Sequence, residues 1–223
     1  MRKSTLHFWL FLAAFYALWI FRATWFYARV DLAIPGSGRQ LLFSLGLKAI
    51  LWILPAAVYI VWHDRQNPLT VMKINTGVHG RMALIGSLVS LAYLSGIVLF
   101  EFLTTGHTFH SLFATAPLTV LVALAANSFS SFIEEVFFRG FVLSRLNESL
   151  GFWLANLIQG FLFVAIHWPN WIWEGGVHWN LLITSAGILL LALLLGWLVR
   201  RTNSIWPGVV VHIANNFISA YLA

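Results

Sequence analysis

Apolar residues follow one another in long runs along the whole chain, and short polar segments separate the runs. A helix needs about 20 consecutive apolar residues to cross the hydrocarbon core of a membrane. Runs of about this length lie at residues 7–28, 41–62, 82–103, 117–146, 152–168, 180–199 and 204–222. The pattern predicts an all-α, polytopic transmembrane helical bundle of about seven spans, without an internal repeat or a second domain.

Composition supports this prediction and excludes other classes. The 223 residues are 60% hydrophobic and 9% charged, whereas a soluble domain carries about 25% charged residues. The net charge of +6 comes from basic residues scattered between apolar runs, so it predicts no binding to nucleic acid. The absence of cysteine excludes a thiolate nucleophile. The expected setting is a lipid bilayer.

The scattered basic residues predict the orientation of the chain. If seven spans alternate, most of the basic residues in the links and at the N-terminus fall on one side: Arg2, Lys3, Arg65, Lys73, Arg81, Arg145, Arg200 and Arg201. Only the first link, with Arg29 and Arg39, breaks this pattern. Because basic residues favour cytoplasmic links, we predict a cytoplasmic N-terminus and an external C-terminus. The small size and the lack of organellar signals favour a multi-pass protein of a prokaryotic cell membrane.

The stretch SFIEEVFFRG places charge inside an apolar run. Each charged group costs about 2.5–3.5 kcal/mol at the centre of a membrane helix, and such groups usually mark function. Glu135 and Arg139 are four residues apart, in the order that favours an ion pair. This pairing leaves Glu134 without a partner. The alternative interpretation is an ion cluster that holds helices together.

The next span offers a partner for Glu134. It ends in FVAIH, where Phe163 and His167 share one helix face. Glu134 lies 15 residues before the turn at Ser149–Gly151, and His167 lies 16 residues after it, so an antiparallel hairpin brings both to one depth. A carboxylate and an imidazole at one level could activate water as general base and orienter. The alternative for a lone histidine is packing at the membrane interface.

The last span contains VVVHIANN, in which His212 and Asn216 share a face. Their donors could stabilise an oxyanion, an interaction whose loss costs about 10²–10³ in rate. Polar side chains of this kind also join membrane helices by hydrogen bonds. The residue pattern leaves both interpretations open.

Together these motifs resemble the CAAX protease and bacteriocin-processing (CPBP) family of intramembrane proteases, which includes the type II CAAX prenyl endopeptidases. That family shows EExxxR, FxxxH and a final HxxxN-like motif on separate helices. The motifs here read EEVFFR (Glu134, Glu135, Arg139), FVAIH (Phe163, His167) and HIANN (His212, Asn216). The resemblance covers about residues 115–222, so we divide the membrane domain into N-terminal helices at 1–114 and a catalytic core of four spans at 115–223.

The resemblance implies a role for each motif. Glu134 with His167 would activate the water that attacks the scissile carbonyl, and His212 with Asn216 would stabilise the oxyanion. Supporting residues would be Glu135, Arg139 and Phe163.

Metal is the open question of mechanism. Glu134, His167 and His212 form a set of two histidines and one carboxylate that is compatible with zinc. The residues fit either arrangement. The resemblance favours a metal-free glutamate mechanism, so we predict neither a metal nor another cofactor.

The function predicted is an intramembrane CAAX-type endopeptidase acting on a peptide or protein, either prenylated or a peptide precursor. The alternative is a non-catalytic immunity or scaffold protein that binds a peptide or partner helix in the same cavity. A transporter is a third possibility, weakened by the absence of repeated, broken-helix halves.

One aromatic run and three charged residues are interpreted as structural. The aromatic run Trp168–Trp179 predicts an outer interfacial belt. Lys48 and Arg22 sit in early spans, where snorkelling to the interface is expected. Asp31 is placed in a link.

Overall fold

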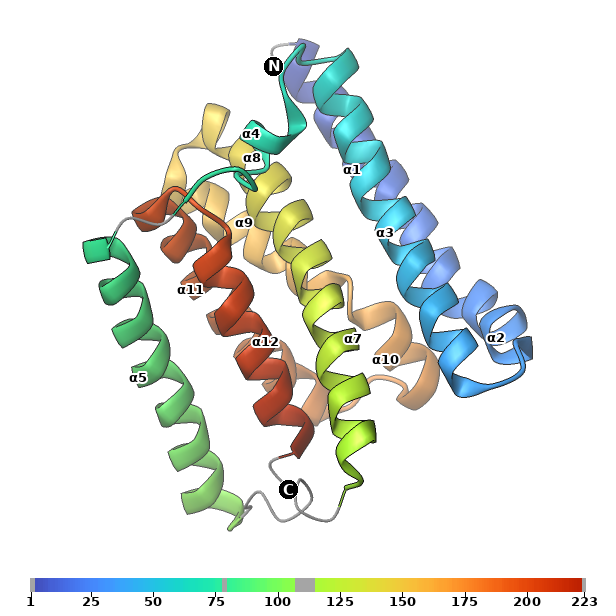
Figure 1. Ribbon diagram of the computed structural model, residues 1–223. Coiled ribbons are helices and arrows are strands. Elements are labelled where there is room, and N and C mark those ends of the chain that lie inside the picture. Colours follow the sequence, from blue (N-terminus) through green and yellow to red (C-terminus); the bar gives the residue numbers. More distant parts are fainter. Residues whose placement is uncertain (1–2, 78–79, 107–114, 222–223) are drawn as a thin grey trace.

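The computed structural model describes residues 3–77, 80–106 and 115–221, and this part of the chain is helical without a strand (Figure 1). Its elements are α1 (Lys3–Phe21), η1 (Arg22–Phe26), α2 (Tyr27–Arg29), η2 (Asp31–Ala33), α3 (Ser37–Trp62), α4 (Pro68–Val71), α5 (Gly80–Thr105), α7 (Pro117–Glu135), η3 (Val136–Val142), α8 (Leu143–Leu150), α9 (Phe152–Ala165), α10 (Trp168–Gly175), α11 (Trp179–Thr202) and α12 (Trp206–Tyr221).

Within these described ranges, six helical segments are long and apolar enough to cross a membrane. They are Leu6–Ala33, Ser37–Trp62, Gly86–Thr105, Pro117–Leu150, Phe152–Gly175 and Trp179–Thr202. The 16-residue α12 adds a shorter seventh helix. The predicted all-α bundle of about seven spans is confirmed, and the chain is a multi-pass membrane protein.

Two predicted boundaries were wrong. The first segment continues to Ala33 and the fifth to Gly175, beyond the predicted ends at 28 and 168. A π-helical turn, η1, carries the first segment past Arg22. Asp31, which was expected in a link, is fully buried and forms an ion pair of 2.5 Å with Arg22. The ion pair neutralises the two charges inside the bundle.

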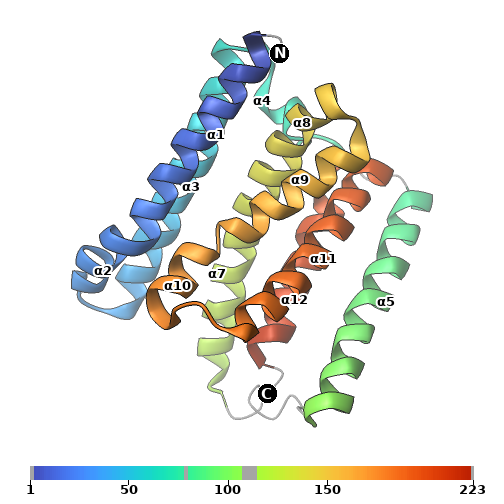
Figure 2. The same ribbon diagram turned by 180° about the vertical axis from the view of Figure 1, so that it is seen from behind.

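The successive long helices alternate in direction, so α1 begins and α12 ends at opposite ends of the bundle (Figure 1). The helix that runs from α7 through η3 to α8 passes through the middle. Helices α3, α9 and α12 surround it, whereas α5 packs on α11 and α12 on the side away from α1 and α3. Seen from behind, α10 lies beside η1 and α2 (Figure 2).

The main core forms where η3 meets α1 and α3. All seven residues of η3 are buried, because this π-helical turn lies at the centre of the bundle. Phe137 stacks on Phe15 at a ring separation of 4.3 Å, and Trp52 closes the cluster from α3. Gly140 permits the segment after α4 to approach η3, since a Cβ there would lie 2.6 Å from the Met72 carbonyl oxygen. This packing fixes the helix that carries the two glutamates.

Candidate active site

Glu134 and Glu135 end α7 and point to different surroundings. The π-helical turn η3 follows directly, and π-helical turns occur frequently at functional sites. Glu134 lines a cavity, whereas Glu135 is fully buried between helices. The two adjacent carboxylates therefore belong to separate side-chain clusters.

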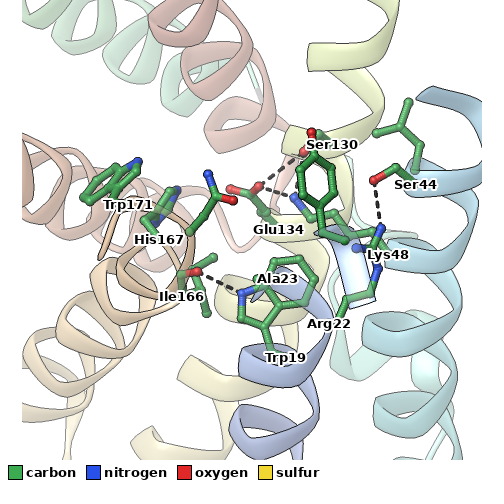
Figure 3. Close-up of a pocket in the computed structure, with 13 residues that line it drawn as sticks. Trp19, Arg22, Ala23, Ser44, Lys48, Ser130, Glu134, Ile166, His167 and Trp171 are labelled. Carbon is green, nitrogen blue, oxygen red and sulfur yellow. Dashed lines mark hydrogen bonds and ion pairs between the residues drawn. The ribbon is translucent and has the colours of Figure 1, made fainter. Parts of the chain in front are cut away.

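The cavity beside Glu134 has a volume of about 310 Å³. Figure 3 shows the Glu134 carboxylate between His167 on one side and Lys48 on the other. The lining residues come from the first two helical segments, from α7, from the end of α9 and from α10: Trp19, Arg22, Ala23, Tyr27, Ser44, Leu45, Lys48, Ser130, Glu134, Ile166, His167, Asn170 and Trp171. The hairpin around Gly151 thus brings Glu134 and His167 to one cavity.

His167 is held in a defined orientation at the end of α9. Its Nδ1 lies 3.0 Å from the carbonyl oxygen of Phe163. Because a carbonyl only accepts, Nδ1 carries the proton of this hydrogen bond, and Nε2 of the neutral ring is free to accept another. Helix α1 supports this end of α9, since Trp19 Nε1 donates to the Ile166 carbonyl at 2.8 Å. A carbonyl at the end of the helix is thereby satisfied.

Lys48 is the functional candidate that the sequence analysis missed. Instead of snorkelling, its Nζ donates to Glu134 Oε1 at 2.5 Å and to Ser130 Oγ at 2.7 Å. The ammonium also lies 4.8 Å from the ring centroid of Trp52. A signal was present in the sequence, because Ser44 and Lys48 place two polar groups four residues apart on one face of an apolar helix.

Arg22 does not snorkel either. Besides its ion pair with Asp31, its Nη2 donates to Ser44 Oγ at 2.9 Å. Both Arg22 and Ser44 line the cavity. The prediction that the charges of the early spans reach the membrane interface was wrong for Arg22 and Lys48, because each finds a carboxylate inside the bundle.

Glu135 is the centre of a packed ion cluster. Its Oε1 lies 2.9 Å from Arg139 Nη1, four residues along the helix, and 2.9 Å from His212 Nδ1. Neither Glu135 nor Arg139 has exposed surface. Phe163 packs beside the cluster, with the Arg139 guanidinium 4.2 Å from its ring centroid and the His212 ring edge-on at 5.6 Å. These contacts join the end of α7 and η3 to α9 and α12.

His212 and Asn216 reach α7 from α12 and are not among the described residues that line the cavity. His212 Nε2 is 3.6 Å from Glu134 Oε2, which is too long for a hydrogen bond. Asn216 Nδ2 donates to Ser131 Oγ at 3.1 Å. The last motif therefore reaches α7, with His212 between the two glutamates and Asn216 one turn away.

The aromatic run forms α10 and the turn after it. Trp171 lines the cavity, and its ring lies 5.3 Å from that of His167. Trp173 and Trp179 are more than half exposed, as a belt at the membrane interface requires. The run thus provides one wall of the cavity in addition to an outer aromatic surface.

Glu134, His167 and His212 are the residues whose types are compatible with a zinc site. Glu134 Oε1 is paired with Lys48, and His212 Nδ1 is paired with Glu135. Within the ranges that the structure describes, no group of three His, Asp or Glu side chains is placed to hold a metal ion. Independence from metal stays a prediction.

One comparison with known proteins gives a match. Residues 115–218 match a family model described as Rce1-like, "Type II CAAX prenyl endopeptidase Rce1-like". All three motifs lie inside the matched segment, and the match confirms the family resemblance found in the sequence. No curated protein and no solved structure matches the chain.

Proposed function

We propose that this chain, whose residues 115–218 match the Rce1-like family model of type II CAAX prenyl endopeptidases, hydrolyses a peptide bond in the cavity beside Glu134. The observation that carries the proposal is the joint lining of this cavity by Glu134 and His167, which come from separate helices. A cavity of about 310 Å³ that contains charged and polar side chains has room for water beside a peptide segment.

In the proposed first step, Glu134 and His167 activate the attacking water. Glu134 Oε2 is the oxygen not bonded to Lys48, and it accepts a proton from the water. His167 orients the same water through Nε2, because its Nδ1 is committed to the Phe163 carbonyl. Glu134 then returns the proton to the leaving amine. General acid–base catalysis of this kind contributes about 10²–10⁴ in rate.

His212 and Asn216 are the proposed donors to the oxyanion. His212 Nε2 lies next to Glu134 Oε2 without a hydrogen bond to it, so it can reach a carbonyl oxygen bound there. His212 would donate from Nε2, while its Nδ1 is held 2.9 Å from Glu135 Oε1. Asn216 contributes the second N–H of its amide. Such donors act best where water is excluded.

The proposed substrate is a peptide or protein segment that reaches the cavity from the membrane. The family's description names prenylated CAAX chains, and a peptide precursor without a lipid is the other candidate. Trp19 and Trp171 give the cavity apolar walls that suit either one. Comparing both kinds of peptide is therefore part of the test.

One observation favours a binding function instead. The Lys48 ammonium holds one oxygen of Glu134 in an ion pair, and this contact opposes the transfer of a proton to that carboxylate. In this second candidate function, the cavity binds a peptide or partner helix without cleaving it, as an immunity or scaffold protein would.

Comparative peptidomics separates the two functions. Cells carrying the native protein, Glu134→Gln or the control Glu148→Gln would be compared; Glu148 carries the same charge but is exposed in α8. We expect peptides that disappear with Glu134→Gln and persist with Glu148→Gln. Full cellular function and an unchanged set of peptides with Glu134→Gln would favour binding over catalysis.

We also propose that the N-terminal end of the bundle faces the cytoplasm. The segment from His63 to Gly77, the α8 end and the α11 end lie there and carry most basic residues of the described links. The chain has no cysteine, so single substitutions can report the two ends without background. A membrane-impermeant thiol reagent applied to intact cells should label Ser37→Cys and spare Ser149→Cys. The reverse pattern would overturn the orientation.

A further inference from the structure

A second cavity, of about 340 Å³, lies near the N-terminal end of the bundle, away from the cavity of Glu134. It is enclosed by the segment after α4, by η3 and α8, by the start of α9 and by the end of α11. Its described lining consists of Lys73, Arg139, Leu143, Ser144, Asn147, Phe152, Val199 and Arg200. Three of these residues are cationic, and none of them is acidic.

Two of the cations have no carboxylate partner among the described residues. Arg200 lies over aromatic rings, 4.4 Å from the centroid of Phe152 and 5.3 Å from that of Trp153. Lys73 adopts a left-handed backbone conformation with φ of 55°, and burial lowers the pKa of its ammonium. By contrast, the nearby Arg145 pairs with Asp64 at 2.7 Å and with Glu148 at 2.7 Å.

The third cation, Arg139, forms the floor of this cavity and has no exposed surface. Its Nη1 pairs with Glu135, and its Nη2 donates to the Ala192 carbonyl at 3.4 Å. Its buried Nε has no hydrogen-bond partner. An unsatisfied buried donor is costly, and this one belongs to a residue of the cavity lining.

We propose that this second cavity binds a phosphate group, either the headgroup of an anionic membrane lipid or free phosphate. A phosphate bears several strong acceptors and accepts charge-assisted hydrogen bonds from lysine and arginine. Lys73, from the segment after α4, and Arg200, from the end of α11, would bind it, and the Ser144 hydroxyl adds a neutral donor. Basic pockets between helices near a membrane surface are a known setting for such headgroups. This binding does not depend on the proposed peptidase function.

The first measurement uses free phosphate as the probe. Thermal unfolding of the full chain in uncharged detergent is followed in sodium phosphate and in sodium chloride of equal ionic strength. The variants are Lys73→Gln and Arg200→Gln. The matched control is Arg201→Gln, which removes the same charge from the adjacent residue, outside the cavity lining and over Trp197. Unfolding temperatures in chloride show whether each variant is folded.

The second measurement uses vesicles that contain phosphatidylglycerol and phosphatidylcholine in equal amounts. Lipids retained by the purified chain are counted by native mass spectrometry. We expect the wild type and Arg201→Gln to retain phosphatidylglycerol preferentially or to be stabilised by phosphate. Lys73→Gln and Arg200→Gln should each weaken that binding by about tenfold or more, because each removes a hydrogen bond to a charged group.

The two arms identify the source of the phosphate. Preference for phosphatidylglycerol without stabilisation by phosphate assigns the cavity to a lipid headgroup, and the opposite result assigns it to a soluble anion. The proposal is overturned if the wild type shows neither effect. It is also overturned if Lys73→Gln and Arg200→Gln bind as strongly as Arg201→Gln does.

Discussion

Glu134 and Glu135 are adjacent in sequence, yet their side chains have different surroundings. Glu134 faces a cavity, where its neighbours are a lysine from α3 and a histidine from α9. Glu135 faces the packed interior, where Arg139 Nη1 and His212 Nδ1 each lie 2.9 Å from its Oε1. The exposed fraction is 7% for Glu134 and 0% for Glu135.

The difference shows how one short motif can supply both reactivity and support. A carboxylate that lines a cavity can exchange protons with water, whereas a carboxylate enclosed by a guanidinium and an imidazole is committed to structure. Buried ion pairs add little net stability, but removing one partner is costly because the other charge is left unpaired. The comparison therefore predicts that a substitution of Glu134 lowers activity and that a substitution of Glu135 lowers stability.

The largest effect is expected for Glu134→Gln. The amide keeps the shape of the side chain but cannot accept the proton of water, so peptide hydrolysis should fall by about 10²–10⁴. The measurement is the cleavage rate of a peptide substrate found by peptidomics, with Glu148→Gln as the control. A Glu134→Gln protein that cleaves at the native rate would remove Glu134 from the chemistry.

Glu135→Gln should act mainly on stability. It leaves the Arg139 guanidinium without a counter-charge in a fully buried position, which costs about 3–5 kcal/mol. Thermal unfolding in detergent should show a marked decrease, and the double variant Glu135→Gln/Arg139→Gln should lose less than the sum of the single losses. Equal unfolding temperatures for Glu134→Gln and Glu135→Gln would contradict the proposal that Glu135 contributes more to stability than Glu134 does.

Gly208→Ala sharpens the comparison with a smaller change on the Glu135 side. A Cβ at this position would lie 3.1 Å from Glu135 Oε2, so α12 must shift or the carboxylate must turn. We expect a destabilisation of about 1–3 kcal/mol, as for other overpacked cores. The matched control is Gly187→Ala in α11, where nothing lies within 4 Å. If both variants unfold alike, the packing around Glu135 is looser than proposed.

Lys48→Met tests the partner on the Glu134 side. Losing the charge-assisted hydrogen bond to Glu134 should lower the cleavage rate by roughly tenfold, because such bonds are worth about 1.5–3 kcal/mol. Lys48→Arg keeps the cation and should retain more activity. A rate that rises in Lys48→Met would instead show that the lysine restrains Glu134, as the binding function requires.

The smallest effect is expected from a chelator. If Glu134 and His167 act on water directly, hydrolysis by the purified protein should be unchanged after treatment with EDTA. Activity that disappears with EDTA and returns with zinc would contradict this mechanism and show that the site binds a metal ion. A control enzyme that requires zinc verifies that chelation is complete.

The spans and the depth of the hairpin could be predicted because both follow from local regularities. Apolar runs determine which segments cross the membrane, and the rise per residue places Glu134 and His167 at one level on either side of Gly151. The i, i+4 spacing likewise identifies the contact between Glu135 and Arg139. None of these inferences requires knowing which distant helices are neighbours.

The contribution of the early helices could not be predicted in this way. Lys48 and Glu134 are separated by 86 positions, and no periodicity in either helix specifies that α3 packs on α7. Hydropathy likewise treats Arg22 as an isolated charge, since it does not show that Asp31 is buried as its ion-pair partner. For His212, the spacing gives a helix face but not its position between two glutamates.

The central claim is that Glu134 and His167 act on the same water, and a double-mutant cycle tests it most directly. Cleavage rates would be measured for the wild type, Glu134→Gln, His167→Ala and the double variant in one lipid preparation. Residues that act as a unit give strongly non-additive effects. The account predicts that the double variant is about as slow as the slower single variant. Losses that multiply, or a His167→Ala rate equal to that of the wild type, would contradict it.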